Sequence, residues 1–544
     1  MNPAPDLPLA RHFTLLVYPF RHALAGGERR DLLQALEGRW LPWWSRLDRD
    51  ALKRTLDDTY FFLPYLREML FPEATHLSPG DPSQQLLEAT RWASLPLPEL
   101  GDRVSEDAVL RLTYNPEQLA TLKPLQLEFT RRNVAGERIE HFTIPFDLCW
   151  VDVVLFPQQV GVLILKVQRT GGEGSVRDLN DFLFYLRPIH PLTIDWVLAD
   201  WRCKLQGAHP LTCKTRDLID FLLQGLAMPD TIVPTLERYL EHLAHHPTAP
   251  RSTGRKEGQV YGQAFHLYTY ACLAQDALRK AEEEQGTAHG FASPAEQALY
   301  ELATGTDTTQ EDYRPHPTQV TRLREQNSIA LWENWQGMAL HQNVVFLGLH
   351  PTRFTRYALA HNVESDYFHL YLLVLYQKLR LSLLHGELIR RHTHFYRNLH
   401  EARLLWEAFL QFRDHYYFTE VTYRPQGNEL YQRFRHGLRV PPLYEEVTAE
   451  VRELHEHYER RYERRLNSLV YFLTFVGLPA GILTELFAGA LIRQATWPEF
   501  FLWVLGVYLF LGGGWGLYRL WERFIRGRMT GFWTRIRKWY RLLR

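Results

Sequence analysis

Cysteine is scarce in this chain. The 544 residues include only four cysteines, which are Cys149, Cys203, Cys213 and Cys272. They form no CxxC pair, and no histidine stands beside them at the spacing of a zinc site. We therefore expect neither a disulfide framework nor a structural zinc knuckle, and reduced thiols place the bulk of the chain in the cytoplasm.

The chain also has no net charge at pH 7 when its histidines are neutral. Lys plus Arg and Asp plus Glu are equal at 62 each, so we expect no nucleic-acid partner. The last segment, residues 519–544, is nevertheless basic, with Glu522 as its single acid. This composition predicts a cytoplasmic tail that either contacts anionic lipid or only fixes the membrane topology.

The signatures of common enzyme classes are absent as well. No nucleophile elbow, HExxH motif or kinase signature occurs. The glycine-rich stretch from Thr170 to Leu186 lacks the lysine and the hydroxyl that a P-loop places after its last glycine. We expect a surface loop with Ser175 as the N-cap of the next helix, phosphate binding by this loop being the alternative. The protein is not expected to be an enzyme.

Two long apolar segments stand out near the C-terminal end. The first covers residues 466–492 with Glu485 as its only charge, and the second covers residues 500–518 with none. Each is long enough to cross a bilayer as a helix. Basic residues flank the pair on both sides: Arg464, Arg465, Arg519 and Arg523. This pattern predicts a transmembrane hairpin, integral to the inner or plasma membrane, with both ends cytoplasmic. The alternative is a soluble enzyme with two buried helices.

The remaining sequence predicts an α+β cytosolic domain followed by long stalk helices. Residues 1–350 contain strand-like runs at Leu110–Tyr114 and Leu125–Thr130, and a hairpin formed by Trp150–Phe156 and Gly161–Val167. Residues 351–465 form a helical bundle and stalk. It contains one long helix from Asp366 to Phe418 and a second whose apolar face extends from Leu443 to Leu469. Prolines at 425, 441 and 442 are expected to end or kink helices.

Histidines gather in two places. One group is His242, His245 and His246, and the other is His385, His392, His394 and His400. Glu241, Glu387 and Glu401 stand near them, so a regulatory metal site is one interpretation. The spacings match no known set of metal ligands, and we expect solvated or packed histidines.

The C-terminal hundred residues resemble the CorA superfamily of divalent cation channels. The stretch from Leu473 to Ala490 is similar to the first membrane helix of that family, with Pro479 at the place of its proline and Phe487 at the place of its aromatic residue. The loop residues Trp497, Pro498 and Glu499 resemble its Met-Pro-Glu. The resemblance implies a CorA-like fold, a homopentamer in the lipid bilayer, and transport of Mg²⁺ or another divalent cation.

The chain departs from that family at the signature that follows the proline. Ala488, Gly489 and Ala490 stand where the family has Gly-Met-Asn, and Ala490 offers no side-chain oxygen to a hydrated ion. A stripe at helical spacing is the expected pore lining: Asn467, Thr474, Leu478, Gly481, Glu485 and Ala488. Glu485 is then either a ring of acids inside the pore mouth or a side chain that reaches the headgroups.

The sequence therefore predicts a magnesium channel or metal ion transporter gated by its cytosolic domain. No resident cofactor is firmly implied, and the identity of any metal ligands is left open. The alternative is a non-conducting or signal-gated membrane sensor. By its size and loop the chain resembles the CorA-like phage-defence effectors of type III CRISPR systems, which implies a nucleotide ligand.

Overall fold

The computed structural model describes most of the chain. The described residues are 7–22, 29–75, 82–123, 125–132, 139–169, 174–189, 197–203, 211–227, 235–245, 264–285, 290–308, 313–395 and 399–477, with single positions at 481, 485, 498, 505 and 506. They form two compact units, one of residues 1–392 and 407–450 and the other of residues 393–406 and 451–544.

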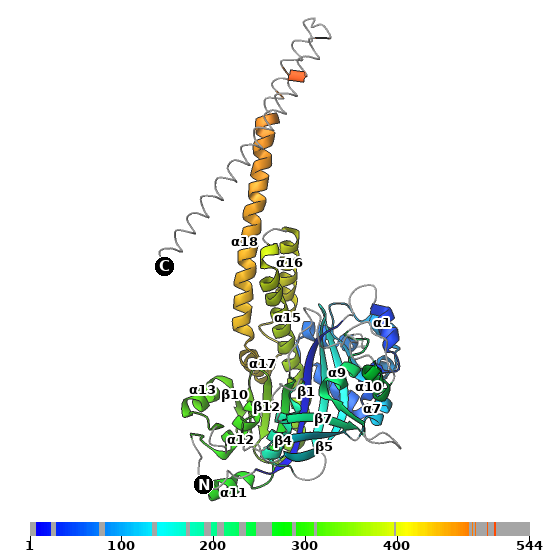
Figure 1. Cartoon of the computed structure of the whole chain (residues 1–544), viewed down its shortest axis with the longest axis vertical. Helices are drawn as coiled ribbons and strands as arrows, with labels where there is room; N and C mark the ends of the chain where they lie inside the picture. Colours follow the sequence, from blue (N-terminus) through cyan, green and yellow to red (C-terminus); the bar gives the residue numbers. More distant parts are fainter. Residues whose placement is uncertain are drawn as a thin grey trace. The chain divides into compact units, whose positions relative to one another are not determined.

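A mixed sheet of twelve described strands forms the centre of the first unit (Figure 1). Ten strands run in the order β10-β11-β12-β9-β1-β6-β5-β4-β7-β8, and β3 joins β5 and carries β2. All the pairings are antiparallel except that between β9 and β12. The strands are β1 Leu9–Arg21, β2 Trp40–Pro42, β3 Leu110–Tyr114, β4 Leu125–Arg132, β5 Ile139–Phe156, β6 Val160–Arg169, β7 Val197–Cys203, β8 Leu211–Lys214, β9 His266–Leu273, β10 Ser328–Trp332, β11 Trp335–Ala339 and β12 Asn343–Gly348.

Helices are inserted between these strands and follow them. In chain order they are α1 Arg29–Leu36, η2 Trp43–Arg46, α2 Arg49–Thr59, α3 Pro64–Leu70, α4 Pro72–Thr75, α5 Pro82–Ala93, α6 Leu97–Arg103, α7 Pro116–Thr121, α8 Val176–Leu186, α9 Thr215–Leu222, α10 Leu236–His245, α11 Ala277–Gln285, α12 Pro294–Thr304, α13 Pro317–Asn327, η4 Phe354–Leu359, α14 Ala360–Glu364, α15 Asp366–Phe395, α16 Leu399–Tyr416, α17 Pro425–Gly437, α18 Val440–Phe472 and η5 Leu473–Gly477.

The strands expected from the sequence are confirmed. β3 covers the expected Leu110–Tyr114, and β5 and β6 pair as the expected hairpin, with Phe156 opposite Val160. The turn between them holds Gln158 and Gln159 at φ of 59° and 67°, the left-handed conformation that tight hairpins need. Ser175 is the expected N-cap of α8, because its side chain accepts a hydrogen bond from the Asp178 amide.

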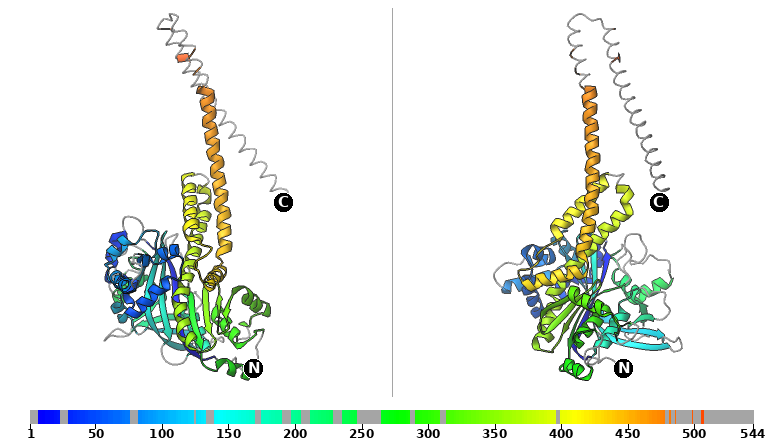
Figure 2. Two further views of the ribbon diagram at one scale, coloured as in Figure 1. Left: turned by 180° about the vertical axis from the view of Figure 1, so that it is seen from behind. Right: turned by 90° about the vertical axis from the view of Figure 1, so that its left-hand side faces the viewer.

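Helices cover both faces of the sheet in the first unit. On one face Tyr268 of β9 packs against Phe368 and Tyr371 of α15, and Phe156 of β5 stacks on Tyr376 of the same helix. Figure 2 shows α15 alongside the strands. On the other face lie α8, α9 and α12. Because side chains alternate along a strand, His266 of β9 shares the α15 face with Tyr268.

The helical segment differs from the sequence expectation in one respect. The single helix expected from Asp366 to Phe418 is two helices, α15 and α16, with residues 396–398 between them outside the described part. The prolines act as expected of residues that cannot donate a backbone hydrogen bond. Pro425 opens α17, and Pro441 and Pro442 lie in the first turn of α18, where the missing donor costs little.

The structure contradicts our expectation of a transmembrane hairpin over residues 466–518. Among the described residues no helix is both long and apolar enough to cross a membrane. The longest helices are α15 with 30 residues and α18 with 33. Their longest stretches without acids, lysine or arginine are residues 367–377 and 466–472, each shorter than the roughly 20 apolar residues that a span needs.

This finding contradicts the predictions of a CorA-like fold with a membrane hairpin, of integral membrane localisation and of an ion-transport class. The fold is an α+β body on a large mixed sheet, with long helices after it. Most of the hairpin beyond Gly477 lies outside the described residues.

Candidate metal centre

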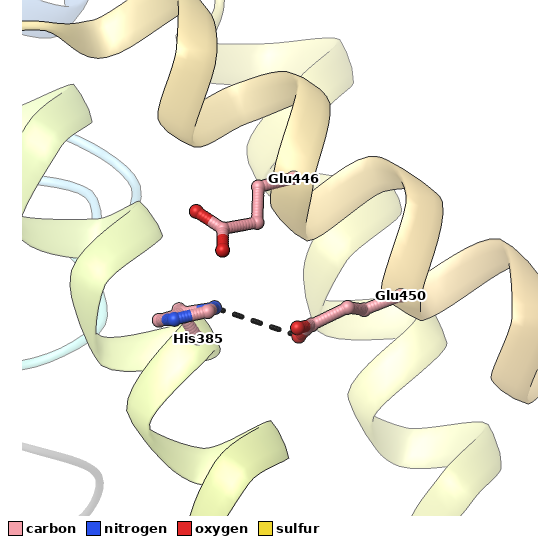
Figure 3. Close-up of side chains that lie close together, drawn as sticks. All are labelled: His385, Glu446 and Glu450. Carbon is pink, nitrogen blue, oxygen red and sulfur yellow. Dashed lines mark ion pairs between the residues drawn. The ribbon is translucent and has the colours of Figure 1, made fainter.

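Three side chains with metal-binding atoms come together between α15 and α18 in the first unit. They are His385 of α15 and Glu446 and Glu450 of α18 (Figure 3). The two glutamates are one helical turn apart, so they lie on the same face of α18. Figure 3 shows both carboxylates on the side of α18 that faces the imidazole ring.

Packing on both helices fixes this arrangement. On α15, His385 follows the fully buried Leu384, and Leu388 one turn on is also buried. On α18, Val447 is fully buried next to Glu446. The Tyr444 ring stacks on Tyr417, with 3.9 Å between ring centroids, and so holds the first turns of α18 in place.

The ligand atoms are close enough to share one ion. One atom from each of the three residues lies within 4.8 Å of the other two. The Nδ1 atom of His385 is 3.5 Å from Oε2 of Glu450, yet it is shielded from solvent and makes no hydrogen bond. A buried imidazole nitrogen without a hydrogen bond costs free energy, and a bound cation would remove that cost.

The donor set indicates which ions the centre would accept. One imidazole nitrogen and two carboxylate oxygens suit Zn²⁺, Mn²⁺ or a similar transition metal better than Mg²⁺, which prefers oxygen ligands alone. Glu446 is exposed and the other two residues are half-buried. Water therefore has access to the remaining coordination positions.

The sequence identified only one member of this centre. His385 stands in the expected second histidine cluster, but its partners are Glu446 and Glu450, not the expected Glu387 and Glu401. Those partners lie on a helix some sixty residues further along the chain, and only the fold brings them near. The other expected cluster, at residues 242–246, has its histidine side chains outside the described part of the chain.

The expected pore and loop residues are not part of this centre. Asn467, Thr474, Gly481, Glu485 and Pro498 are described, exposed and helical, and Arg464 is exposed on α18. The Thr474 hydroxyl donates a hydrogen bond to the Val470 carbonyl oxygen, 2.8 Å away. The following lie outside the described residues: Leu478, Ala488, Gly489, Ala490, Trp497, Glu499, Arg519 and Arg523. Arg465 lies in α18, and its side chain is not described.

Sequence reasoning missed a buried ionic cluster on the α15 face of the sheet. The carboxylate of Asp152 accepts hydrogen bonds from Arg46 at 3.1 Å and from Arg111 at 2.8 Å, and it has no solvent exposure. Arg111 also contacts Nε2 of His369, at 2.8 Å, and lies over the Trp43 ring. Burial alone would raise the pKa of Asp152, but the two guanidinium groups hold it below its usual value.

Two titratable side chains beside this cluster, His369 and Glu73, have pKa values shifted towards their uncharged forms. Burial and Arg111 lower the pKa of His369 to about 3, so the imidazole is neutral and its Nε2 accepts a hydrogen bond from Arg111. Burial raises the pKa of Glu73 to about 7. The cluster joins β3, β5, η2 and α15 through paired charges, which is the arrangement of a structural core, although Oδ1 of Asp152 makes no hydrogen bond.

Comparisons with known proteins do not identify a family. No family model matches the sequence, and no curated protein matches it either. The resemblance to the CorA superfamily and to its type III CRISPR-associated branch therefore finds no support in these comparisons.

Proposed function

We propose that this protein is a divalent-cation-responsive regulator in which the bound ion fastens α15 to α18. The observation that carries the proposal is the convergence of His385, Glu446 and Glu450 on one small volume. The ion would be a transition metal such as Mn²⁺ or Zn²⁺, and it would bridge two helices that are distant in the sequence. The proposal keeps the divalent cation and the regulatory role of the sequence prediction, and it omits ion conduction.

The negative charges of Glu446 and Glu450 support a regulatory role for this metal centre. Without a cation, two like charges one turn apart on a helix repel each other by a few tenths of a kcal/mol. A bound divalent ion reverses this repulsion and adds a connection to α15. A ligand that binds only the folded protein stabilises it by about 2.7 kcal/mol at a hundred times its dissociation constant. Metal concentration would thus set the stability of the α15–α18 contact.

Mn²⁺ is the best probe of the centre. Zn²⁺ would also bind to the free thiols and to other histidines, whereas Mn²⁺ prefers oxygen and imidazole ligands over thiolates. Free Mn²⁺ is counted by electron paramagnetic resonance, so binding is measured without an activity assay. We expect one strong Mn²⁺ site per chain, which Zn²⁺ displaces and Mg²⁺ displaces weakly.

Two variants test whether the strong site is this centre. His385→Ala and Glu446→Gln should each weaken Mn²⁺ binding by at least about tenfold, since loss of even an indirect metal partner costs that much. Glu453→Gln is the matched control, because Glu453 is exposed on the same helix and belongs to no described ion pair. Hydrogen exchange of the α15 and α18 amides should slow on addition of Mn²⁺ in the wild type and in this control only.

Two results would overturn the proposal. If Glu446→Gln and Glu453→Gln bind Mn²⁺ as the wild type does, the strong site lies elsewhere. If Mn²⁺ binds at the centre but leaves the exchange of α15 and α18 unchanged, the ion does not fasten the two helices.

A further inference from the structure

A second cluster, made of basic groups, lies in the first unit on the α15 side of the sheet. Its members come from four separate segments. They are Arg187 directly after α8, His341 in the turn between β11 and β12, Lys378 of α15, and Arg439 between α17 and α18. We call these residues the basic cluster.

Hydrogen bonds place Lys378 and Arg187 at the turn between β11 and β12. The Lys378 ammonium donates to the His341 carbonyl oxygen at 3.0 Å and lies 3.3 and 3.4 Å from the two nitrogens of that ring. Arg187 donates to the side-chain oxygen of Gln342 at 2.5 Å, and its carbonyl oxygen accepts a hydrogen bond from the Phe265 amide at 2.9 Å. The guanidinium therefore lies beside both the β11–β12 turn and the start of β9.

In the described part of the chain, no acidic side chain pairs with the basic cluster. Among the described residues none forms an ion pair with Arg187, Lys378 or Arg439, although Lys166 on the same sheet pairs with Glu364 at 2.6 Å. Burial lowers the pKa of Lys378 to about 8. Burial, Lys378 and Arg439 lower the pKa of His341. Burial is the largest cause of both shifts, and for His341 the neighbouring positive groups add to it.

His266 supplies an independent observation at the same place. Its side chain is only 6% exposed, and its Nδ1 atom makes no hydrogen bond. Burial, together with the nearby Lys378, His341 and Arg187, lowers its pKa to about 3. Buried polar nitrogens are rarely left without a partner in native proteins, so each one calls for an explanation.

The backbone at Arg439 is strained. Its φ is 59°, a left-handed conformation that glycine adopts without strain and that costs an arginine roughly 1 kcal/mol. Glycine would be the better residue for the turn between α17 and α18. The left-handed residue closes the C-terminal end of α17, where the Arg439 amide donates a hydrogen bond to the His436 carbonyl oxygen at 3.0 Å.

We propose that Arg187, His341, Lys378 and Arg439 bind a phosphate group. A phosphate dianion matches more than one positive charge, and guanidinium forks, an ammonium and an imidazole are the usual donors to its oxygens. A single carboxylate would leave most of this charge unpaired. The site does not depend on the metal centre, and it differs from the glycine-rich loop at residues 170–174.

Calorimetry with inorganic phosphate and with adenosine monophosphate tests the proposal on the full chain. We expect saturable binding of at least one of them, competition by sulfate, and none by chloride. If adenosine monophosphate binds with higher affinity than inorganic phosphate, the ligand is a phosphate ester. If inorganic phosphate binds with equal or higher affinity, the ligand is the free ion. Titrations in two buffers of different ionisation enthalpy should reveal proton uptake, since the anion favours the charged forms of Lys378 and His341.

Two variants distinguish a loss of phosphate binding from a failure of the protein to fold. Lys378→Met should weaken phosphate binding by about tenfold or more, whereas Lys280→Met, on the exposed surface of α11, should leave it unchanged. Arg439→Gly removes the guanidinium and also the backbone strain, so the variant should fold as well as the wild type and still lose about tenfold in affinity.

Either of two results overturns the proposal. One is that the wild type binds neither inorganic phosphate nor adenosine monophosphate. The other is that a folded Arg439→Gly variant and Lys378→Met both bind with the affinity of the wild type.

Discussion

Lys378 and His385 lie two helical turns apart along α15, so the basic cluster and the metal centre share one helix. Arg439 directly precedes α18, and Glu446 lies in the second turn of that helix. Seven residues of helix rise by about 10 Å, which is close to the distance over which charges interact at physiological ionic strength. The two proposed sites therefore lie near enough to influence each other.

The first prediction is that Mn²⁺ and phosphate help each other to bind. Charges of +2 and −2 about 10 Å apart attract by roughly 1 kcal/mol after screening, which corresponds to about a two- to fivefold gain in affinity. The gain must be the same in both directions, because the coupling is reciprocal. It is measured by calorimetry of phosphate with and without Mn²⁺.

Glu446→Gln is the control for that coupling. The variant meets the same Mn²⁺–phosphate complexes in solution but lacks the metal centre. An equal gain in the wild type and in Glu446→Gln would mean that the two sites act separately.

The second prediction concerns the pH dependence of stability. Burial and the nearby Asp58 raise the pKa of Asp366, in the first turn of α15, to about 8, while Arg424 and His361 lower it. In the unfolded chain this group ionises near pH 3.9. The folded protein therefore holds an extra proton between these values, and the free energy of unfolding falls as the pH rises through this window.

Asp366→Asn should remove that fall. At pH 7 the variant should be more stable by a few kcal/mol, at most about 4, and the two proteins should converge near pH 4. Urea unfolding across the pH range measures the difference, with Asp57→Asn on the exposed face of α2 as the control. A wild-type and a variant curve that run parallel would show that Asp366 is ionised in the folded state.

The third prediction concerns the buried charges around Asp152. Asp152→Asn leaves Arg46 and Arg111 buried without their counter-charge, and this should cost about 3–5 kcal/mol of unfolding free energy. Adding Arg111→Met should recover part of the loss, because the two side chains act as a pair. Denaturant unfolding measures both, against Asp147→Asn at an exposed position of β5. Strictly additive losses would argue against the pairing.

The fourth prediction links the packing of α17 to the basic cluster. A Cβ atom on Gly437 would lie 2.5 Å from the Ala339 carbonyl oxygen at the end of β11. Gly437→Ala must therefore push α17 away from the turn that carries His341, at a cost of about 1–3 kcal/mol. The neighbouring Arg439 should move with it, so phosphate affinity should fall as well. Gly386→Ala on α15, where a Cβ meets only the end of an arginine side chain at 3.8 Å, should not lower stability and should leave phosphate affinity unchanged.

Local patterns along the chain were enough to predict several elements. β3 includes the β-branched Thr113 and the aromatic Tyr114, and all five of its residues are buried, so the expected boundaries are correct. Ser175 caps α8 because its hydroxyl reaches an amide three residues on, which is a contact within one turn. Prolines begin α17 and α18 for the equally local reason that they lack an amide donor.

Predictions from local sequence patterns were wrong where the same pattern is compatible with more than one structure. Apolar residues at helical spacing predicted one helix from Asp366 to Phe418, but that spacing does not mark the place where α15 ends and α16 begins. The expected membrane hairpin rested on apolar length in the sequence, and among the described residues no helix is both long and apolar enough to cross a membrane.

By itself the sequence determined four of the twelve described strands, the Ser175 cap and the start of α15 at Asp366, because these depend on neighbours within one or two turns. Only the tertiary structure decided the two sites. His385 meets Glu446 and Glu450 because α18 packs against α15. Lys378 meets His341 because a sheet turn closes over the same helix. A ligand set assembled from distant segments leaves no fixed spacing in a sequence, since the intervening chain is free to vary in length.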